Sequence, residues 1–145
     1  MPLKKQKVFV VHSHLARNHH YDLRLEMNGV LKSWAVPKEP PKTKANKRLA
    51  IQVEDHPLSY AKFEGIIPEG NYGAGKVEIW DEGTYELVSK DDKTPQAYPE
   101  TFFKKLLTKG KIEIEFHGKK LKGKYVLVKT HYGNKPEKSW LFFKI

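Results

Sequence analysis

Cysteine is absent from the 145 residues of the sequence. Its absence excludes disulfide bonds, zinc sites with thiolate ligands and cysteine nucleophiles, and it fits a protein of a reducing compartment. Long hydrophobic runs are absent as well, because the N-terminal segment contains only four consecutive apolar residues, at positions 8–11. A run of four is too short for the core of a signal peptide or for a membrane span. We therefore expect a soluble, cytoplasmic protein that does not interact with membranes.

Acidic residues are fewer than basic ones, with 17 Asp plus Glu against 27 Lys plus Arg and a net charge of +10. Such an excess creates a positive field that attracts polyanions, of which nucleic acid is the most abundant in the cytosol. Charge alone does not distinguish a nucleic-acid-binding protein from a small basic domain that is merely soluble.

Helical periodicity is rare in the sequence. Only residues 99–110 repeat apolar side chains at three-to-four spacing, with Pro99 suited to the first turn and Gly110 to a C-terminal cap. Most of the remaining chain consists of short segments with strand-like patterns, separated by turn signals. We predict an all-β, mainly antiparallel fold, with residues 1–145 forming one domain. Its expected architecture is a small closed or nearly closed β-barrel of about eight strands with one short helix.

The predicted fold is organised around a strand at residues 20–27. Because side chains alternate along a strand, this strand has a polar face and an apolar face, formed respectively by His20, Asp22, Arg24, Glu26 and by Tyr21, Leu23, Leu25, Met27. The following Asn28 and Gly29 favour a type I′ turn, which returns residues 30–37 antiparallel to the first strand. This turn sets the register, with Leu23 opposite Trp34.

Two other segments give local predictions. Residues 48–54 alternate as a strand. The apolar side chains expected to face inward are Leu49, Ile51 and Val53, and the polar ones expected to face outward are Arg48, Gln52 and Glu54. His56 has the same parity as the polar side chains. The tripeptide at residues 81–83, Asp-Glu-Gly, is expected to form the turn of a hairpin between strands at residues 76–80 and 84–88.

Two imidazoles and a carboxylate form a candidate metal site. Residues two apart on a strand lie about 6.6 Å from each other and point the same way, so His20 and Asp22 can converge on one ion. His14 would complete the set from a turn before this strand, whereas His19 should face away. Nitrogen and oxygen ligands without sulfur suit Mn²⁺, Fe²⁺ or Zn²⁺. The alternative is a polar surface that happens to be rich in histidine.

Arg24 follows on the same face of the strand. Its guanidinium matches the oxygens of a phosphate in geometry and charge. The alternative is an ion pair with Asp22 or Glu26.

Several segments in one order resemble the 3′-phosphoesterase module of bacterial ATP-dependent DNA ligase D and its free-standing prokaryotic relatives. One is His14 followed, after five residues, by the run His-Tyr-Asp-Leu-Arg-Leu-Glu at positions 20–26. The similarity continues through most of the chain, at residues 29–38, 53–60, 63–75, 80–84 and 116–123.

The resemblance implies a small β-barrel enzyme that heals DNA 3′ ends for end joining. Such enzymes depend on Mn²⁺, with Zn²⁺ or Co²⁺ also bound in vitro, and they remove a 3′-terminal phosphate or ribonucleotide to leave a 3′-hydroxyl. By this resemblance the metal ligands are His14, His20 and Asp22, the catalytic residues are Arg24, His56 and Tyr60, and the phosphate or DNA contacts are Arg24, Lys38, Arg48, His56 and Tyr60. The implied partners are primer-template DNA 3′ ends and a separate DNA ligase, polymerase and end-binding protein.

The sequence departs from the family pattern in two ways. Fused relatives have a longer segment before the first motif, with charged residues that assist ribonucleotide removal. In this sequence only seven residues precede Val8. We therefore expect 3′-phosphate removal to be the more efficient activity. In addition, His12 stands where relatives usually have Gln, and His19 where a hydrophobic residue is usual.

Two other functions remain open at this point. One is a non-haem iron oxygenase, in which His20, Asp22 and His56 would form a facial triad. The other is a non-catalytic barrel that binds nucleic acid through aromatic and lysine side chains.

Overall fold

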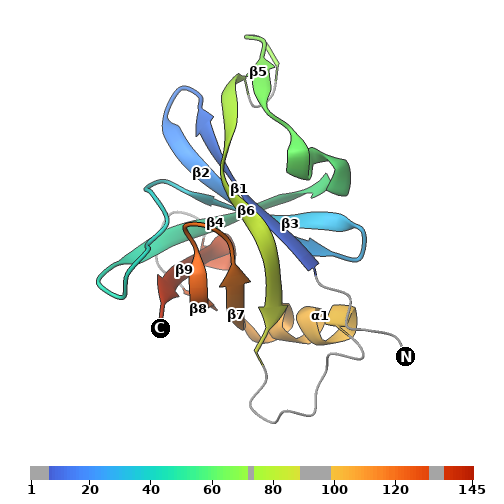
Figure 1. Cartoon of the computed structure of the whole chain (residues 1–145), viewed down its shortest axis with the longest axis vertical. Coiled ribbons are helices and arrows are strands. Elements are labelled where there is room, and N and C mark those ends of the chain that lie inside the picture. The colour runs from blue at the N-terminus through green and yellow to red at the C-terminus, as the bar shows by residue number, and fades with distance from the viewer. Residues whose placement is uncertain (1–6, 72–73, 89–98, 131–135) are drawn as a thin grey trace.

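The computed structural model describes residues 7–71, 74–88, 99–130 and 136–145. Within these ranges the chain forms nine strands, one α-helix and two short 3₁₀ helices (Figure 1). The strands are β1 (Lys7–Leu15), β2 (His19–Met27), β3 (Val30–Val36), β4 (Lys47–Pro57), β5 (Gly65–Ile67), β6 (Gly75–Leu87), β7 (Lys111–His117), β8 (Lys122–Lys129) and β9 (Ser139–Lys144). The helices are α1 (Pro99–Lys109), η1 (Leu58–Lys62) and η2 (Pro136–Lys138).

Eight of the strands close into an antiparallel β-barrel. Around the ring their order is β1-β2-β3-β4-β9-β8-β7-β6, and β6 pairs again with β1. The short β5 is added beside the start of β6, outside the ring. The predicted closed, mainly antiparallel barrel is therefore confirmed. Closure joins most of the backbone hydrogen-bonding groups of these strands into one continuous ladder.

Large apolar side chains fill the barrel. Leu23, Leu25 and Met27 of β2 belong to this core, as predicted, and Tyr21 packs against it while partly buried. The largest fully buried side chains are Trp34, Trp140, Tyr85, Tyr125, Phe9, Phe103, Phe116 and Phe142. Burial of each such side chain stabilises the fold by roughly 1.5–3 kcal/mol.

Helix α1 has the predicted bounds and cap. Phe103 inserts into the core, where its ring meets that of Tyr85 edge-on, with 6.3 Å between centroids. Gly110 follows the helix with φ of 82°, the left-handed conformation that favours glycine at this position. In Figure 1 the helix lies at the end of the molecule opposite β5. Among the described residues, no helix is long and apolar enough to cross a membrane.

The β2–β3 hairpin follows the predicted register. Asn28 and Gly29 both have positive φ, of 54° and 81°, as the type I′ turn requires. Leu23 pairs with Trp34, and on the other face Arg24 pairs with Ser33. The turn dipeptide thus determines which residues lie beside the polar face of β2.

The predicted faces of β4 are wrong. Leu49 is 36% exposed, whereas Ala50 is fully buried in the core opposite Trp140. Gln52 pairs with Trp34 and accepts a hydrogen bond from the indole of Trp140 at 3.2 Å. Two tryptophans occupy the volume inside this part of the barrel, so the small and polar residues of β4 face inward.

The predicted turn at residues 81–83 is also wrong, because β6 runs without interruption from Gly75 to Leu87. Its pairing with β1 shifts at Asp81, which is buried and accepts hydrogen bonds from three backbone N–H groups at 2.8–3.0 Å, those of Lys119, Lys120 and Leu121. The Asp81 side chain therefore stabilises the turn at residues 119–121 and does not form a turn itself. Gly83 meets a steric requirement here, since a Cβ at this position would lie 2.2 Å from the carbonyl oxygen of His117.

Candidate metal and phosphate site

The outer face of β1 and β2 carries the candidate site. His14 was predicted in a turn, but it lies within β1 and pairs with His20 of β2. Antiparallel partners point to the same side of a sheet, and the two rings meet with their centroids 4.8 Å apart. His12 and Asp22 form the next pair along the same two strands. Regular strand pairing is therefore sufficient to bring these residues together.

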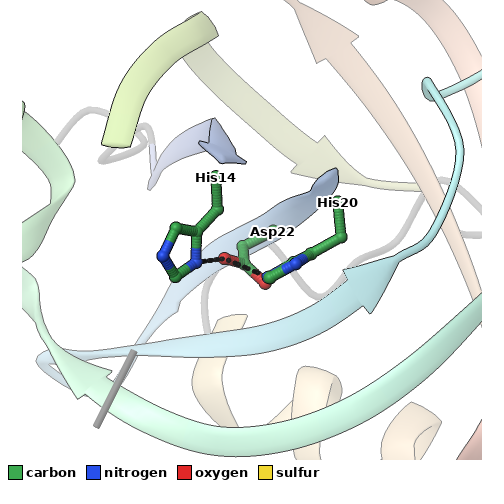
Figure 2. A group of neighbouring side chains, drawn as sticks. All are labelled: His14, His20 and Asp22. Atoms are coloured by element: carbon green, nitrogen blue, oxygen red, sulfur yellow. Dashed lines mark ion pairs between the residues drawn. The ribbon is translucent and has the colours of Figure 1, made fainter. Parts of the chain in front are cut away.

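His14, His20 and Asp22 form a compact group of possible ligands, with all three ligand atoms within 4.8 Å of one another. Asp22 Oδ2 lies 3.4 Å from His20 Nε2 and 3.8 Å from His14 Nδ1, and Figure 2 shows the carboxylate between the two rings. Two atoms that each lie about 2.1 Å from one ion are about 3.0–3.4 Å apart in octahedral or tetrahedral geometry. The three donors therefore fit a single divalent ion after small side-chain adjustments.

Charge interactions keep the Asp22 carboxylate ionised. Burial alone would raise the pKa of Asp22, but the hydrogen bond with His20 and the charges of Arg24, His20 and His14 hold this pKa below its usual 3.8. The same hydrogen bond is the main cause that raises the pKa of His20 above 6.5. A buried carboxylate surrounded by cationic groups suits a position that receives a cation in place of protons.

Arg24 is buried directly beside this group and contacts four side chains. Its Nη2 donates to Asp22 Oδ2 at 3.2 Å, its Nη1 to Ser33 Oγ at 2.9 Å, and its Nε to His12 Nδ1 at 3.0 Å. His56 Nδ1 lies 3.0 Å from the same Nη1. The predicted ion pair with Asp22 therefore exists, and the other contacts fix the guanidinium in one orientation.

His12 is a member of the site that the sequence analysis did not identify. Its ring is fully buried, and burial and then the charge of Arg24 lower its pKa from 6.5 to about 4. The ring is therefore neutral near pH 7. Since Nδ1 accepts from Arg24, the proton is on Nε2. Its position two residues before His14, on the same face of one strand, is the sequence signal that could have identified it.

A bulge brings His56 to this face. Ser33 pairs with Val53, but Leu31 pairs with His56, so β4 has one more residue than β3 between these pairs. The extra residue reverses the alternation, and His56 turns toward Arg24. The parity from which His56 was grouped with the polar residues of this strand does not extend past the bulge.

Tyr60, in η1, covers Arg24 and the two neighbouring histidines. The Arg24 guanidinium carbon lies 5.1 Å from the centre of its ring, and the rings of His12 and His56 lie at 5.1 Å and 5.0 Å. Burial raises the pKa of Tyr60, so its hydroxyl stays protonated at neutral pH. Burial, and then the charge of Arg24, lower the pKa of His56.

In the described part of the chain, Lys38 and Arg48 lie outside the group of possible metal ligands formed by His14, His20 and Asp22. Lys38 is exposed and follows the end of β3, whereas Arg48 is the second residue of β4 and pairs with Phe142 of β9. Arg48 donates from Nε to the carbonyl of Glu39 at 2.8 Å. His19 lies on the opposite face from His20, as expected, and its Nε2 is 2.8 Å from Ser13 Oγ.

The arrangement does not favour the facial-triad alternative. In the described structure the possible ligands grouped with His20 and Asp22 include His14 and not His56. The Nδ1 atom of His56 lies 3.0 Å from Arg24 Nη1, so an N–H donor already occupies this nitrogen.

Comparison with known proteins gives one family. Residues 12–129 match the family model described as DNA ligase D 3′-phosphoesterase domain. The chain is 48% identical over 123 residues to a protein of Mycobacterium tuberculosis named multifunctional non-homologous end joining DNA repair protein LigD, with 85% of this chain and 14% of the relative covered. A LigD of Pseudomonas aeruginosa is 46% identical over 136 residues, 94% of this chain and 15% of the relative. The chain thus spans about one-seventh of the length of these curated relatives.

Proposed function

Because the chain belongs to the DNA ligase D 3′-phosphoesterase domain family, we propose that it is a metal-dependent hydrolase that heals DNA 3′ ends. It removes a 3′-terminal phosphate, and a 3′-terminal ribonucleotide, and leaves a 3′-hydroxyl. The observation that carries this proposal is the 3.2 Å contact between Asp22 and Arg24, which places a candidate metal ligand beside a candidate phosphate-binding group. The names of the relatives refer to non-homologous end joining, which supports a place in that repair process. A separate ligase, polymerase and end-binding protein are the partners we propose.

His14, His20 and Asp22 would hold the ion. Two imidazoles and one carboxylate without sulfur are donors suited to Mn²⁺, and they also accept Zn²⁺ or Co²⁺ in vitro. When bound, such an ion supplies Lewis-acid polarisation of a phosphoryl oxygen and lowers the pKa of a coordinated water. The low pKa of Asp22 keeps this ligand available without competition from protons at neutral pH.

Arg24 stabilises the negative charge that develops on the phosphoryl group. Its contacts with His12, Ser33, His56 and Asp22 hold the guanidinium in place before substrate arrives. A charge that needs no reorientation during the reaction stabilises the transition state more than a mobile one does. Ser33 and His12 act as positioning residues, because they accept hydrogen bonds from Arg24.

In this proposal His56 offers a hydrogen-bond donor at Nε2. His56 Nδ1 lies 3.0 Å from Arg24 Nη1, which can only donate, and 3.3 Å from the carbonyl oxygen of Glu54, which can only accept. The shorter contact favours an accepting Nδ1 and places the imidazole proton on Nε2. The lowered pKa keeps this ring neutral at pH 7. A neutral imidazole N–H is suited to bind a phosphoryl oxygen or to support the departing sugar oxygen, and the protonated Tyr60 hydroxyl offers a second donor nearby.

The test combines activity with metal binding. Primer-templates that end in a 3′-phosphate or a 3′-ribonucleotide are incubated with the protein across a panel of divalent ions, with and without chelator. We expect hydrolysis with Mn²⁺ and none after exhaustive chelation. Full activity in the chelated protein would exclude the mechanism.

Variants separate the roles of the residues. Substitution of His14, His20 or Asp22 by Ala should remove both bound metal and activity. Arg24→Ala and His56→Ala should retain metal and slow turnover by about 10². His117→Ala is the matched histidine control, because its ring is exposed and its Nε2 lies 3.2 Å from the carboxylate of Glu86, away from the candidate site. Loss of metal in His56→Ala together with retention in His14→Ala would instead support the facial triad.

A further inference from the structure

An aromatic surface lies on the side of the sheet opposite the metal-ligating group. His19 and Tyr21 have ring centroids 4.8 Å apart, and Tyr21 meets Trp80 edge-on at 5.8 Å. Lys120 Nζ lies 4.7 Å from the centre of the Trp80 ring and donates to the Trp80 carbonyl at 2.8 Å. These four residues, from β2, β6 and the β7–β8 turn, are called the rim platform below.

The rim platform is open because part of the sheet extends past the closed barrel. Strand β6 pairs with β7 only from Thr84 to Leu87, and its first residues, from Gly75 to Val77, pair with β5 instead. In Figure 1 this extension lies at the end of the molecule opposite α1. The inward faces of β2 and β6, which bury core residues lower in the barrel, therefore reach solvent here.

Trp80 differs from the other two tryptophans in its exposure. Trp34 and Trp140 are 0% and 1% exposed, whereas Trp80 and Tyr21 pack against the core with part of each ring and keep the rest accessible. An accessible indole with an ammonium group above it is a pairing typical of sites that stack bases and neutralise phosphates. The core does not require this lysine, because its side chain is exposed.

The rim platform and the proposed catalytic site lie on opposite faces of the same strand, β2. His19 and Tyr21 alternate along β2 with His20 and Asp22, so the two sets occupy opposite faces of the same few residues. Between the two faces lies the β1–β2 turn, where Arg17 is exposed, and the exposed Lys38 follows the end of the neighbouring strand β3. A nucleic-acid strand that leaves the catalytic face at this end meets basic side chains and then the rim platform.

We propose that the rim platform binds unpaired nucleotides of the strand opposite the DNA 3′ end. Bases of this strand would stack on Trp80 and Tyr21, and Lys120 would bind a phosphate. This inference rests on the proposed function, which supplies the DNA end. Stacking tolerates any base, because every base has a π face, so binding should depend on single-strandedness and not on sequence. The net charge of +10 complements the occupant.

Trp80 fluorescence provides a direct test, because it is the accessible tryptophan of the three. The protein is titrated in chelator with oligonucleotides that carry a 3′-hydroxyl, so that binding is measured without catalysis. One duplex has a single-stranded extension on the strand opposite the 3′ end and the other is blunt. We expect the extended duplex to quench the accessible fluorescence and the blunt duplex to quench it much less.

Variants make the test specific. Trp80→Leu should weaken binding of the extended duplex, followed by anisotropy of labelled DNA, by about tenfold, and leave the blunt duplex nearly unaffected. Lys120→Ala should weaken binding a few-fold and reduce the salt dependence by about one counterion. Lys119→Ala is the matched control, since both lysines are exposed and donate backbone N–H groups to Asp81, but only the Lys120 side chain reaches Trp80. The two lysine substitutions do not alter the core. They therefore test the proposal even if Trp80→Leu fails to fold.

The outcomes distinguish this proposal from the proposed function. Equal affinity for the extended and blunt duplexes, or equal effects of Lys119→Ala and Lys120→Ala, would overturn the rim platform even if 3′-phosphate were hydrolysed. Selective quenching by the extended duplex without any hydrolysis in a separate Mn²⁺ assay would support the platform and refute the catalytic role.

Discussion

Replacement of Asp81 by Ala should strongly destabilise the fold, although the position resembles a surface turn in the sequence. Its carboxylate accepts backbone hydrogen bonds from Lys119 at 2.9 Å, Lys120 at 3.0 Å and Leu121 at 2.8 Å. A hydrogen bond to a charged group contributes about 1.5–3 kcal/mol, and a buried N–H left without a partner costs about 1–3 kcal/mol. The N–H of Leu121 is buried, whereas those of Lys119 and Lys120 can regain water. We expect a loss of about 3–4 kcal/mol.

Urea unfolding of three variants measures this contribution. Asp81→Asn retains one carbonyl oxygen and should lose roughly half as much as Asp81→Ala. Glu82→Ala is the control, because the neighbouring Glu82 forms only a surface ion pair with Lys62 at 3.2 Å, for which at most about 1 kcal/mol is expected. If Asp81→Ala unfolds within 1 kcal/mol of Glu82→Ala at equal denaturant dependence, the three hydrogen bonds do not carry the stability assigned to them.

Three further predictions concern pH, salt and packing. His12 has a pKa of about 4 when folded and 6.5 when unfolded, so the unfolded chain binds the extra proton between these values and stability rises with pH across that window. At 1.36 kcal/mol per pKa unit the rise is roughly 3 kcal/mol; His12→Gln should flatten it in urea titrations at pH 4 to 7, and an unchanged slope would contradict the assignment. DNA affinity, measured by anisotropy, should fall steeply between low and physiological salt through counterion release, whereas salt-insensitive binding would indicate a small-molecule substrate. Gly83→Ala should lower the melting temperature measured by circular dichroism, because the added Cβ would lie 2.2 Å from the His117 carbonyl oxygen. Gly29→Ala is the control, since its Cβ would meet no atom within 4 Å, although the φ of residue 29 is 81°. A larger loss in the control would show that backbone strain outweighs the clash.

Local rules predicted the part of the site that lies on regular strands. Alternation placed His20, Asp22 and Arg24 on one face, and the Asn28–Gly29 turn determined the residues opposite them. These relations involve residues close in sequence, whose geometry is determined by backbone periodicity and one turn type. A local pattern is sufficient there, because no distant segment competes for the same position.

Features that depend on distant segments were not predictable in this way. The faces of β4 depend on the space left by Trp34 and Trp140. Trp140, which pairs with Ala50, lies 90 positions after it in the sequence. The direction of His56 depends on an extra residue in the pairing of β4 with β3. Asp81 finds its partners about 40 residues later in the chain. In each case a long-range contact, and not the local sequence pattern, determines the structure.

The ring closure described above also affects the behaviour of the protein at high concentration. Among the described strands the sheet order ends at β5, which presents only the three residues Gly65–Ile67 as an open border and is followed by Pro68. Proline has no N–H to donate, and a border of three residues is too short to template the growth of a foreign strand. Ile66, 75% exposed on that border, can therefore be tolerated without chain-to-chain sheet formation. Protection of this border against strand addition would come from its shortness and from Pro68, and does not require a polar residue there.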